Sequence, residues 1–218
     1  MSKVKLTIAA LAAVIALSAV TAVSASADWF VNGAKLTTSA ALSTTAAVDQ
    51  TTKLLVPSVG DLTIECSGTT LDGINPEIKN PDRGFAAALR FLTCNTVTPA
   101  NCELSNPNET ITTSEILARA FLGAGEEDRV LFSPETKATF ANIAFASTNT
   151  CAFTSTQAVK GAVTIGAPTG QLELAAQAIV GLGSVENNSL EIGSGNKAYL
   201  IGGKALLTLQ SGSKWSFK

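Results

Sequence analysis

The sequence of 218 residues predicts an all-β fold, an antiparallel β-sandwich or β-barrel of about 10–13 short strands held together by disulfides. Three observations support this class. Short apolar runs rich in Val, Ile and Thr recur every eight to twelve residues, with Gly, Asn or Pro between them. Charged residues make up only 15%, too few for the Lys- and Glu-rich surfaces of helices. Four cysteines are present, as is common in exported β domains.

The first 27 residues have the pattern of a secretion signal. Two lysines precede an uncharged apolar stretch over residues 6–27, which closes on Ala25-Ser26-Ala27. A positive start, a short apolar core and a small-residue A-x-A end are the parts of a cleavable signal, so we predict a signal peptide over 1–27 and cleavage before Asp28. The alternative is a retained membrane anchor, but the strongly apolar part has only about 15 residues and a spanning helix needs about 20.

The remaining residues, 28–218, are expected to form a single β domain. Loss of the two signal lysines leaves 13 Lys and Arg against 17 Asp and Glu, a net charge of −4. Nucleic acid and anionic lipid need a basic surface, so we expect neither as a partner. One Tyr, two Trp and nine Phe are few for the aromatic girdles of an outer-membrane barrel, so we expect no membrane span after cleavage. We expect a secreted location, whether extracellular, periplasmic or cell-surface, and an extracellular or cell-surface ligand.

All four cysteines, Cys66, Cys94, Cys102 and Cys151, lie in this mature part. Zinc and redox sites usually contain C-x-x-C, whereas the nearest cysteines here have seven residues between them, so we predict two disulfides. We favour Cys94 with Cys102, which closes a local loop, and Cys66 with Cys151. The alternative, Cys66 with Cys94 and Cys102 with Cys151, follows if the strand ending at Cys66 pairs directly with the strand ending at Cys94.

The chain contains no histidine, which removes Ser-His-Asp and Cys-His nucleophiles and most zinc hydrolase sites. Two S-x-x-K matches, Ser194 to Lys197 and Ser211 to Lys214, fall in Gly-Ser turns rather than at helix starts. A carboxylate pair would suit a hydrolase, but a sequence does not give the separation on which its role depends. We therefore assign no catalytic, cofactor-binding or metal-binding residue, and we expect no cofactor.

Two groups of oxygen-bearing side chains are candidates for calcium. One is Glu126, Glu127 and Asp128, and the other is Asp72 with Asn75. Neither has the spacing of a calcium loop. We interpret the first as a solvated turn, and the second as part of a loop over residues 69–84 that contains Asp-Gly and Asn-Pro turn pairs.

The predicted strands begin directly after the predicted cleavage site. Residues 28–36 give a short aromatic strand with a turn at Asn32-Gly33, and residues 37–52 give a weak strand or a surface loop. Residues 53–66 give two strands around a Pro-Ser-Val-Gly turn. In the second of these, Leu62, Ile64 and Cys66 alternate with polar residues and are expected to face the core.

The later segments continue this pattern. Residues 85–94 are apolar on both faces and predict a central strand. Residues 110–122 fit either a short helix or two strands, and their β-branched residues favour strands. Strands are then expected at the following segments: 129–136, 138–148, 151–155, 158–170, 171–183, 189–195 and 197–217.

Trp29 and Trp215 lie near the two ends of the mature chain. One interpretation is an exposed aromatic platform for a sugar. We favour the other, in which the terminal strands lie close together and their tryptophans fill the core, because aromatic bulk is normally buried.

Several segments in order resemble a group of secreted bacterial proteins of unknown function. They are "IECSG", "LRFLTC" with a second cysteine soon after, "ITTSEI", "VLFSPE", "TFANI", a fourth cysteine and "VKGAV", within residues 54–165. The resemblance implies secretion and a β fold, and it carries over no catalytic residue. Our leading hypothesis is a non-catalytic binding or structural component of the bacterial surface. The alternatives are an extracellular carboxylate-based hydrolase of glycan or peptide, and a carrier of an apolar ligand in a barrel cavity.

Overall fold

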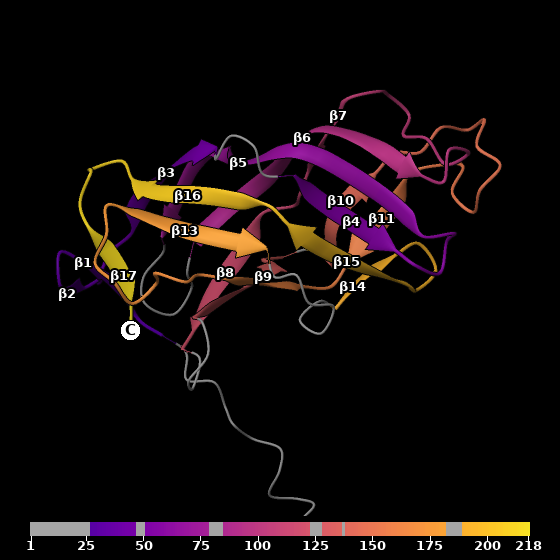
Figure 1. Ribbon diagram of the computed structural model, residues 1–218. Coiled ribbons are helices and arrows are strands. Elements are labelled where there is room, and N and C mark those ends of the chain that lie inside the picture. The colour runs from indigo at the N-terminus through magenta and orange to yellow at the C-terminus, as the bar shows by residue number, and fades with distance from the viewer. Residues whose placement is uncertain (1–26, 47–50, 79–84, 123–127, 137, 182–188) are drawn as a thin grey trace, which may run out of the picture.

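A computed structural model describes residues 27–46, 51–78, 85–122, 128–136, 138–181 and 189–218 (Figure 1). These residues form antiparallel strands and turns without a helix, so the predicted fold class is confirmed. The described residues form 17 strands rather than 10–13, because several of these strands have only two or three residues and alternation cannot reveal such short elements. In this described part, no helix is long and apolar enough to cross a membrane.

A long hairpin organises the fold. It consists of β5 (Leu62–Ile78) and β6 (Phe85–Thr98), which pair from Thr63↔Thr98 to Ile78↔Phe85. Both strands are more than twice the usual strand length of about 5–6 residues. One half of each strand can therefore belong to one barrel and the other half to a second barrel. The loop predicted from residue 69 is therefore wrong as far as Ile78. A register shift between Asp72 and Glu77 accommodates the turn-forming residues within β5.

The first barrel contains the C-terminal half of β5 and the N-terminal half of β6. The ring continues through β3 (Ala40–Ala46), β16 (Lys204–Leu209), β13 (Ala176–Gly181), β12 (Val163–Gly166), β9 (Arg129–Pro134) and β8 (Ile116–Phe121). Three of its ladders, β3–β5, β12–β13 and β6–β8, have only two residue pairs each. Its buried apolar side chains include Leu42, Ile78, Ile116, Val130, Phe132, Val163, Ile179 and Leu207.

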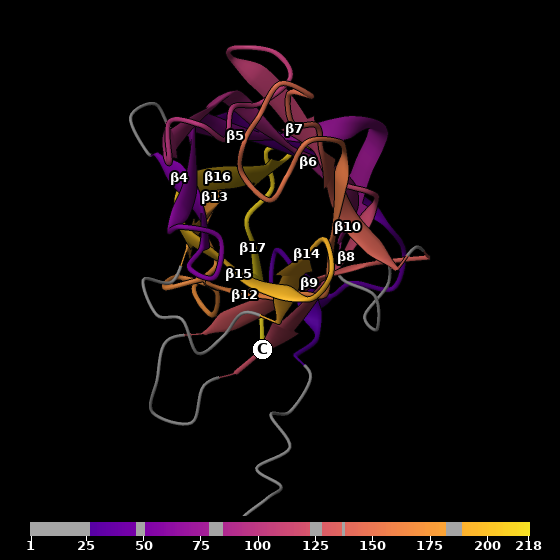
Figure 2. The ribbon, with the colours of Figure 1, turned by 90° about the vertical axis from the view of Figure 1, so that its right-hand side faces the viewer.

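The second barrel contains the other halves of the same hairpin. The ring continues through β4 (Thr52–Val56), β15 (Asn196–Gly202), β14 (Leu190–Ile192), β11 (Gln157–Lys160), β10 (Thr139–Ile143) and β7 (Glu109–Thr112). It is nearly closed, because β7 and β10 meet beside a single bridge, Thr113↔Ala141, and at the bond from Ser114 N to Phe140 O, 2.8 Å. Figure 2 views the molecule from the end of this barrel.

A small sheet closes the first barrel at the end opposite the second. It consists of β1 (Trp29–Val31), β2 (Ala34–Lys35) and β17 (Trp215–Phe217), and Trp29 pairs with Phe217. The Trp29 and Trp215 rings are buried with centroids 5.8 Å apart, so the prediction that the two ends of the chain meet and fill the core is confirmed. Asn32 and Gly33, at φ 48° and 78°, form the predicted hairpin turn.

The two disulfides are Cys66–Cys94 and Cys102–Cys151. The pairing favoured from the sequence is wrong, and the alternative is present. The reason is the register of the long hairpin, which places Cys66 directly opposite Cys94 with their Cα atoms 4.0 Å apart. Cys94 therefore bonds to Cys66, and Cys102 bonds to Cys151 instead of to Cys94.

Among the other local predictions, several are confirmed and one is wrong. The segment 110–122 forms two strands, β7 and β8, as favoured, and Leu62, Ile64 and Cys66 face the core. The strand predicted at 151–155 is absent, because Cys151 and Phe153 are held in a loop by contacts with their neighbours.

Candidate functional site

Four turns gather at the end of the second barrel that lies away from the tryptophans, and we call this surface the loop end. It comprises residues 57–61, 99–108, 144–156 and 193–195, which connect β4 to β5, β6 to β7, β10 to β11 and β14 to β15 (Figure 2). Binding sites commonly form at barrel mouths, where loops are presented by a rigid scaffold. The loop end is therefore the candidate site.

Side-chain bonds join neighbouring turns of the loop end to one another. Thr98 Oγ1 at the end of β6 donates to Asp61 O at 2.8 Å, and Ser58 Oγ donates to Asn196 Oδ1 at 2.9 Å. A Cβ on Gly193 would lie 3.2 Å from Phe153, so the turn at 193–195 packs against the long loop 144–156. The turns consequently support each other around the barrel mouth.

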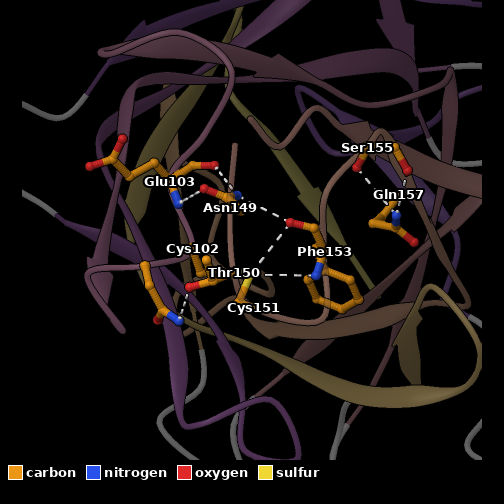
Figure 3. The surroundings of a disulfide bond; sticks show 9 residues. Cys102, Glu103, Asn149, Thr150, Cys151, Phe153, Ser155 and Gln157 are labelled. Carbon is orange, nitrogen blue, oxygen red and sulfur yellow. Dashed lines mark hydrogen bonds between the residues drawn. A yellow bond between two sulfur atoms is a disulfide. The ribbon is translucent and has the colours of Figure 1, made fainter. Parts of the chain in front are cut away.

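The covalent link of the loop end is Cys102–Cys151, which joins the two longest loops (Figure 3). Beside it, the Asn149 side chain bonds to both the backbone N–H and the backbone C=O of Glu103, whose C=O also accepts from Ala146 N at 3.0 Å. The Asn149 side chain accepts from Glu103 N at 3.0 Å and donates to Glu103 O at 2.8 Å and to Phe153 O at 3.1 Å. These bonds use three of the four hydrogen-bonding positions of the amide, which fixes both loops.

Apolar side chains lie beneath these loops and close the barrel mouth. The rings of Phe145 and Phe153 are buried with centroids 5.0 Å apart, next to buried Cys102 and Leu104. The described interior contains a hollow of about 30 Å³ within the second barrel and another of about 40 Å³ where the two barrels meet. Each has room for only one or two water molecules.

The outer surface of the loop end is polar and almost uncharged. Its exposed charged residues, within the part that the structure describes, are Asp61 and Glu103, and exposed Lys197 lies next to it on β15. The other exposed residues are mainly hydroxyl and amide side chains, namely Ser58, Asn101, Ser105, Asn106, Asn108, Ser147, Thr148, Thr150, Thr154, Ser155, Thr156 and Ser194. Such side chains offer adaptable hydrogen bonds to a polar ligand, as they do in antibody loops.

A depression of about 350 Å³ lies between two of the turns. Its lining consists of Pro57, Ser58, Gly195, Asn196, Lys197 and Tyr199. This volume is at the lower end of the range for ligand pockets, about 300–1,000 Å³. The sequence does not indicate that these residues meet, because Ser58 and Asn196 are 138 residues apart and are brought together by the β4–β15 pairing. Lys197 was singled out only as part of an S-x-x-K match.

The comparisons with known proteins add no further information. No family model, curated protein or solved structure matches this chain.

The two S-x-x-K matches lie at opposite ends of the molecule, and the two disulfides lie at different depths in the second barrel. Ser194 lies in the turn 193–195 but Lys197 lies in β15, so the first match is only partly in a turn. Ser211 and Lys214 lie in the turn before β17, as predicted. Cys102 and Cys151 belong to the loop end. Cys66 and Cys94 lie deeper in the same barrel.

Of the side chains considered as calcium ligands, the structure describes only one. Asp128 is buried and accepts from the backbone N–H and the side-chain amide of Gln171, at 3.2 and 2.7 Å, so its assignment to a solvated turn is wrong. Glu126 and Glu127, and the side chains of Asp72 and Asn75, lie outside the described residues. Among the residues that are described, no three Cys, Asp or Glu side chains are grouped so as to hold a metal ion.

Glu109 is the carboxyl group on the inner face of β7. It shares that face with Ile111, and its Oε2 atom is buried without a hydrogen-bond partner. Burial raises the pKa of Glu109 above its ordinary value of 4.5. The folded protein therefore holds this proton more tightly than the unfolded chain. Stability should fall as pH rises from 4.5 through the folded pKa, and then stay at the lower level.

We expect Glu109→Gln to be more stable than the natural protein at pH 7 and equally stable at pH 3, where the carboxyl is neutral in both folded and unfolded chains. Urea unfolding midpoints at the two pH values measure this. Glu103→Gln, which removes a carboxyl group at an exposed position, is the matched control and should not reproduce the gain in stability at pH 7. A gain from Glu109→Gln of equal size at both pH values would show that the carboxylate charge is not responsible.

Proposed function

We propose that this protein is an exported, non-catalytic binding component of the bacterial surface or envelope, and that its loop end holds the ligand. The observation that supports this proposal is the way in which the turns of the loop end are joined to one another. Four turns are joined by a disulfide and by side-chain hydrogen bonds into one polar, nearly uncharged face with a depression. Loops that are ordered before binding lose little conformational entropy when a ligand arrives.

Export is supported by the signal pattern and by the two disulfides, which persist in oxidising compartments. Ala27, the last residue of the predicted signal, is buried and its N–H donates to Ala120 O at 3.0 Å. A peptidase needs the bond between Ala27 and Asp28 to be accessible. Cleavage at this bond would therefore precede folding.

The volumes of the hollows favour surface binding over carriage of an apolar ligand. The interior hollows of about 30 and 40 Å³ are roughly a tenth of what a small-molecule carrier needs. The hydrolase hypothesis requires two carboxyl groups with different pKa values on either side of a substrate. Glu109 has a raised pKa, but it lies on the inner face of the barrel beneath the loops rather than in the depression.

The test is sedimentation of the purified mature protein with envelope fragments of the producing cells. We expect the natural protein to co-sediment and Thr154→Arg, which places a bulky charge on the loop end, to weaken binding at least tenfold. Thr37→Arg is the matched control, because Thr37 is also exposed but follows β2 at the other end of the molecule. The control should bind like the natural protein.

Two results would overturn the proposal. One is failure of the natural protein to bind any fragment, and the other is equal binding by the two Arg variants. The intact mass of protein recovered from the culture fluid tests export separately. A chain that begins at Asp28 and lacks four hydrogens is expected, whereas an uncleaved chain with free thiols would contradict it.

A further inference from the structure

We propose that the depression between the β4–β5 and β14–β15 turns binds a sugar ring that bears a carboxylate, such as a uronic acid within an envelope glycan. This inference rests on the proposed function and specifies its ligand class. Four kinds of group line the depression: a hydroxyl, an amide, an aromatic ring and one cation.

The hydroxyl and amide provide unused hydrogen-bonding capacity. Ser58 Oγ donates to Asn196 Oδ1 at 2.9 Å, which leaves the lone pairs of Ser58 able to accept. Asn196 Nδ2 donates to Ile192 O at 3.4 Å, which leaves its second N–H able to donate. A donor and an acceptor held side by side match adjacent sugar hydroxyls, each of which can both donate and accept.

The apolar part of the lining comes from Tyr199 and Pro57. Tyr199 is the one tyrosine of the chain, and its position on β15 is held by pairing with Leu55 on β4. An aromatic ring with a polar tip suits a ligand that is apolar on its C–H face and polar at its edges. A sugar ring has this character, whereas a purely apolar ligand would leave the amide and hydroxyl unpaired.

The charge of the lining selects the kind of sugar. Lys197 is the one ionisable cation among the lining residues, and no carboxylate is among them. Lys197 lies opposite Glu191 in the β14–β15 ladder, but its ammonium forms no ion pair within 4 Å with a residue that the structure describes. A carboxylate on the sugar would supply that partner and would gain a charge-assisted hydrogen bond.

The size of the depression limits the affinity. A volume of about 350 Å³ that is open to solvent has room for one ring, and a shallow site for one ring is expected to bind with a dissociation constant of about 1 mM. Useful avidity on an envelope would therefore come from repeated ligands or from additional contacts with neighbouring loops.

The experiment titrates the natural mature protein with a glucuronic acid oligosaccharide and with the neutral glucose oligosaccharide of the same linkage, followed by NMR chemical shifts. We expect the acidic sugar to bind about tenfold more tightly. Lys197→Gln should remove that preference, and Tyr199→Ala should abolish binding of both sugars. Lys214→Gln, in the corresponding S-x-x-K turn at the other end of the molecule, is the matched control and should change nothing.

Tyr199→Phe serves as a second variant in case Tyr199→Ala fails to fold, and it should retain the ring contact and bind with at most a few-fold loss. Equal binding of the two sugars, or a preference that survives Lys197→Gln, would overturn the inference. So would the absence of saccharide binding in a protein that still co-sediments with envelopes, and that result would leave the proposed function intact. Loss of co-sedimentation by the natural protein would instead remove the proposed function.

Discussion

Trp215→Ala is expected to lower the free energy of unfolding by about 3–5 kcal/mol, the usual cost of removing a buried large aromatic side chain. Trp215 is 1% exposed and packs against Trp29, with ring centroids 5.8 Å apart. Its loss leaves a cavity where the two ends of the mature chain meet, so the small sheet can no longer close the first barrel. Urea unfolding with the disulfides intact measures the change.

Trp215→Phe separates packing from polarity at the same position. The Nε1 atom of Trp215 is buried without a hydrogen-bond partner, which is unfavourable in the natural protein. Phenylalanine loses volume but removes this N–H, so we expect a loss well below that of Trp215→Ala. Leu172→Ala, at a residue 57% exposed in a nearby turn, should change stability by less than about 0.5 kcal/mol. A Trp215→Ala loss below about 1 kcal/mol would contradict the role assigned to the ring.

The features that the sequence predicted correctly follow from neighbouring residues or from the burial of bulky side chains. The Asn32-Gly33 turn needs two adjacent residues at positive φ, and the inward face of Leu62, Ile64 and Cys66 follows from alternation alone. The meeting of Trp29 with Trp215 was predicted from bulk at both ends of the chain. In each case the physical preference of the residue is expressed locally or through simple burial.

The features that could not be predicted from the sequence depend on the register between strands that are distant in the chain. Cys66 lies opposite Cys94 only because β5 and β6 continue through Asp72-Gly73 and Asn75-Pro76, where turn chemistry predicted a loop. A bulge absorbs those residues at little cost, and no local signal distinguishes a bulged strand from a turn. The depression has the same origin, because Ser58 and Asn196 meet across 138 residues of chain.

Replacement of Cys102 and Cys151 together by alanine is expected to cost about 4 kcal/mol, the loop entropy of a link across 49 residues. The double replacement should also make the two loops that the disulfide joins more mobile. The two loops that it joins would then be held by Asn149, by a bond from Ser105 N to Ala144 O at 2.9 Å and by a few similar contacts. Hydrogen exchange of residues 99–108 and 144–156 measures the release, and envelope sedimentation measures its effect on binding.

The matched control is the double alanine variant at Cys66 and Cys94, whose link across 28 residues should cost a similar amount, about 3.5 kcal/mol. These cysteines lie opposite each other within a ladder whose hydrogen bonds remain when the sulfurs are removed. The control should therefore lose stability while amides in the loop end stay protected and binding persists. If both variants exchanged alike and bound alike, the Cys102–Cys151 link would contribute to global stability only, and preorganisation of the loop end would not be the basis of binding.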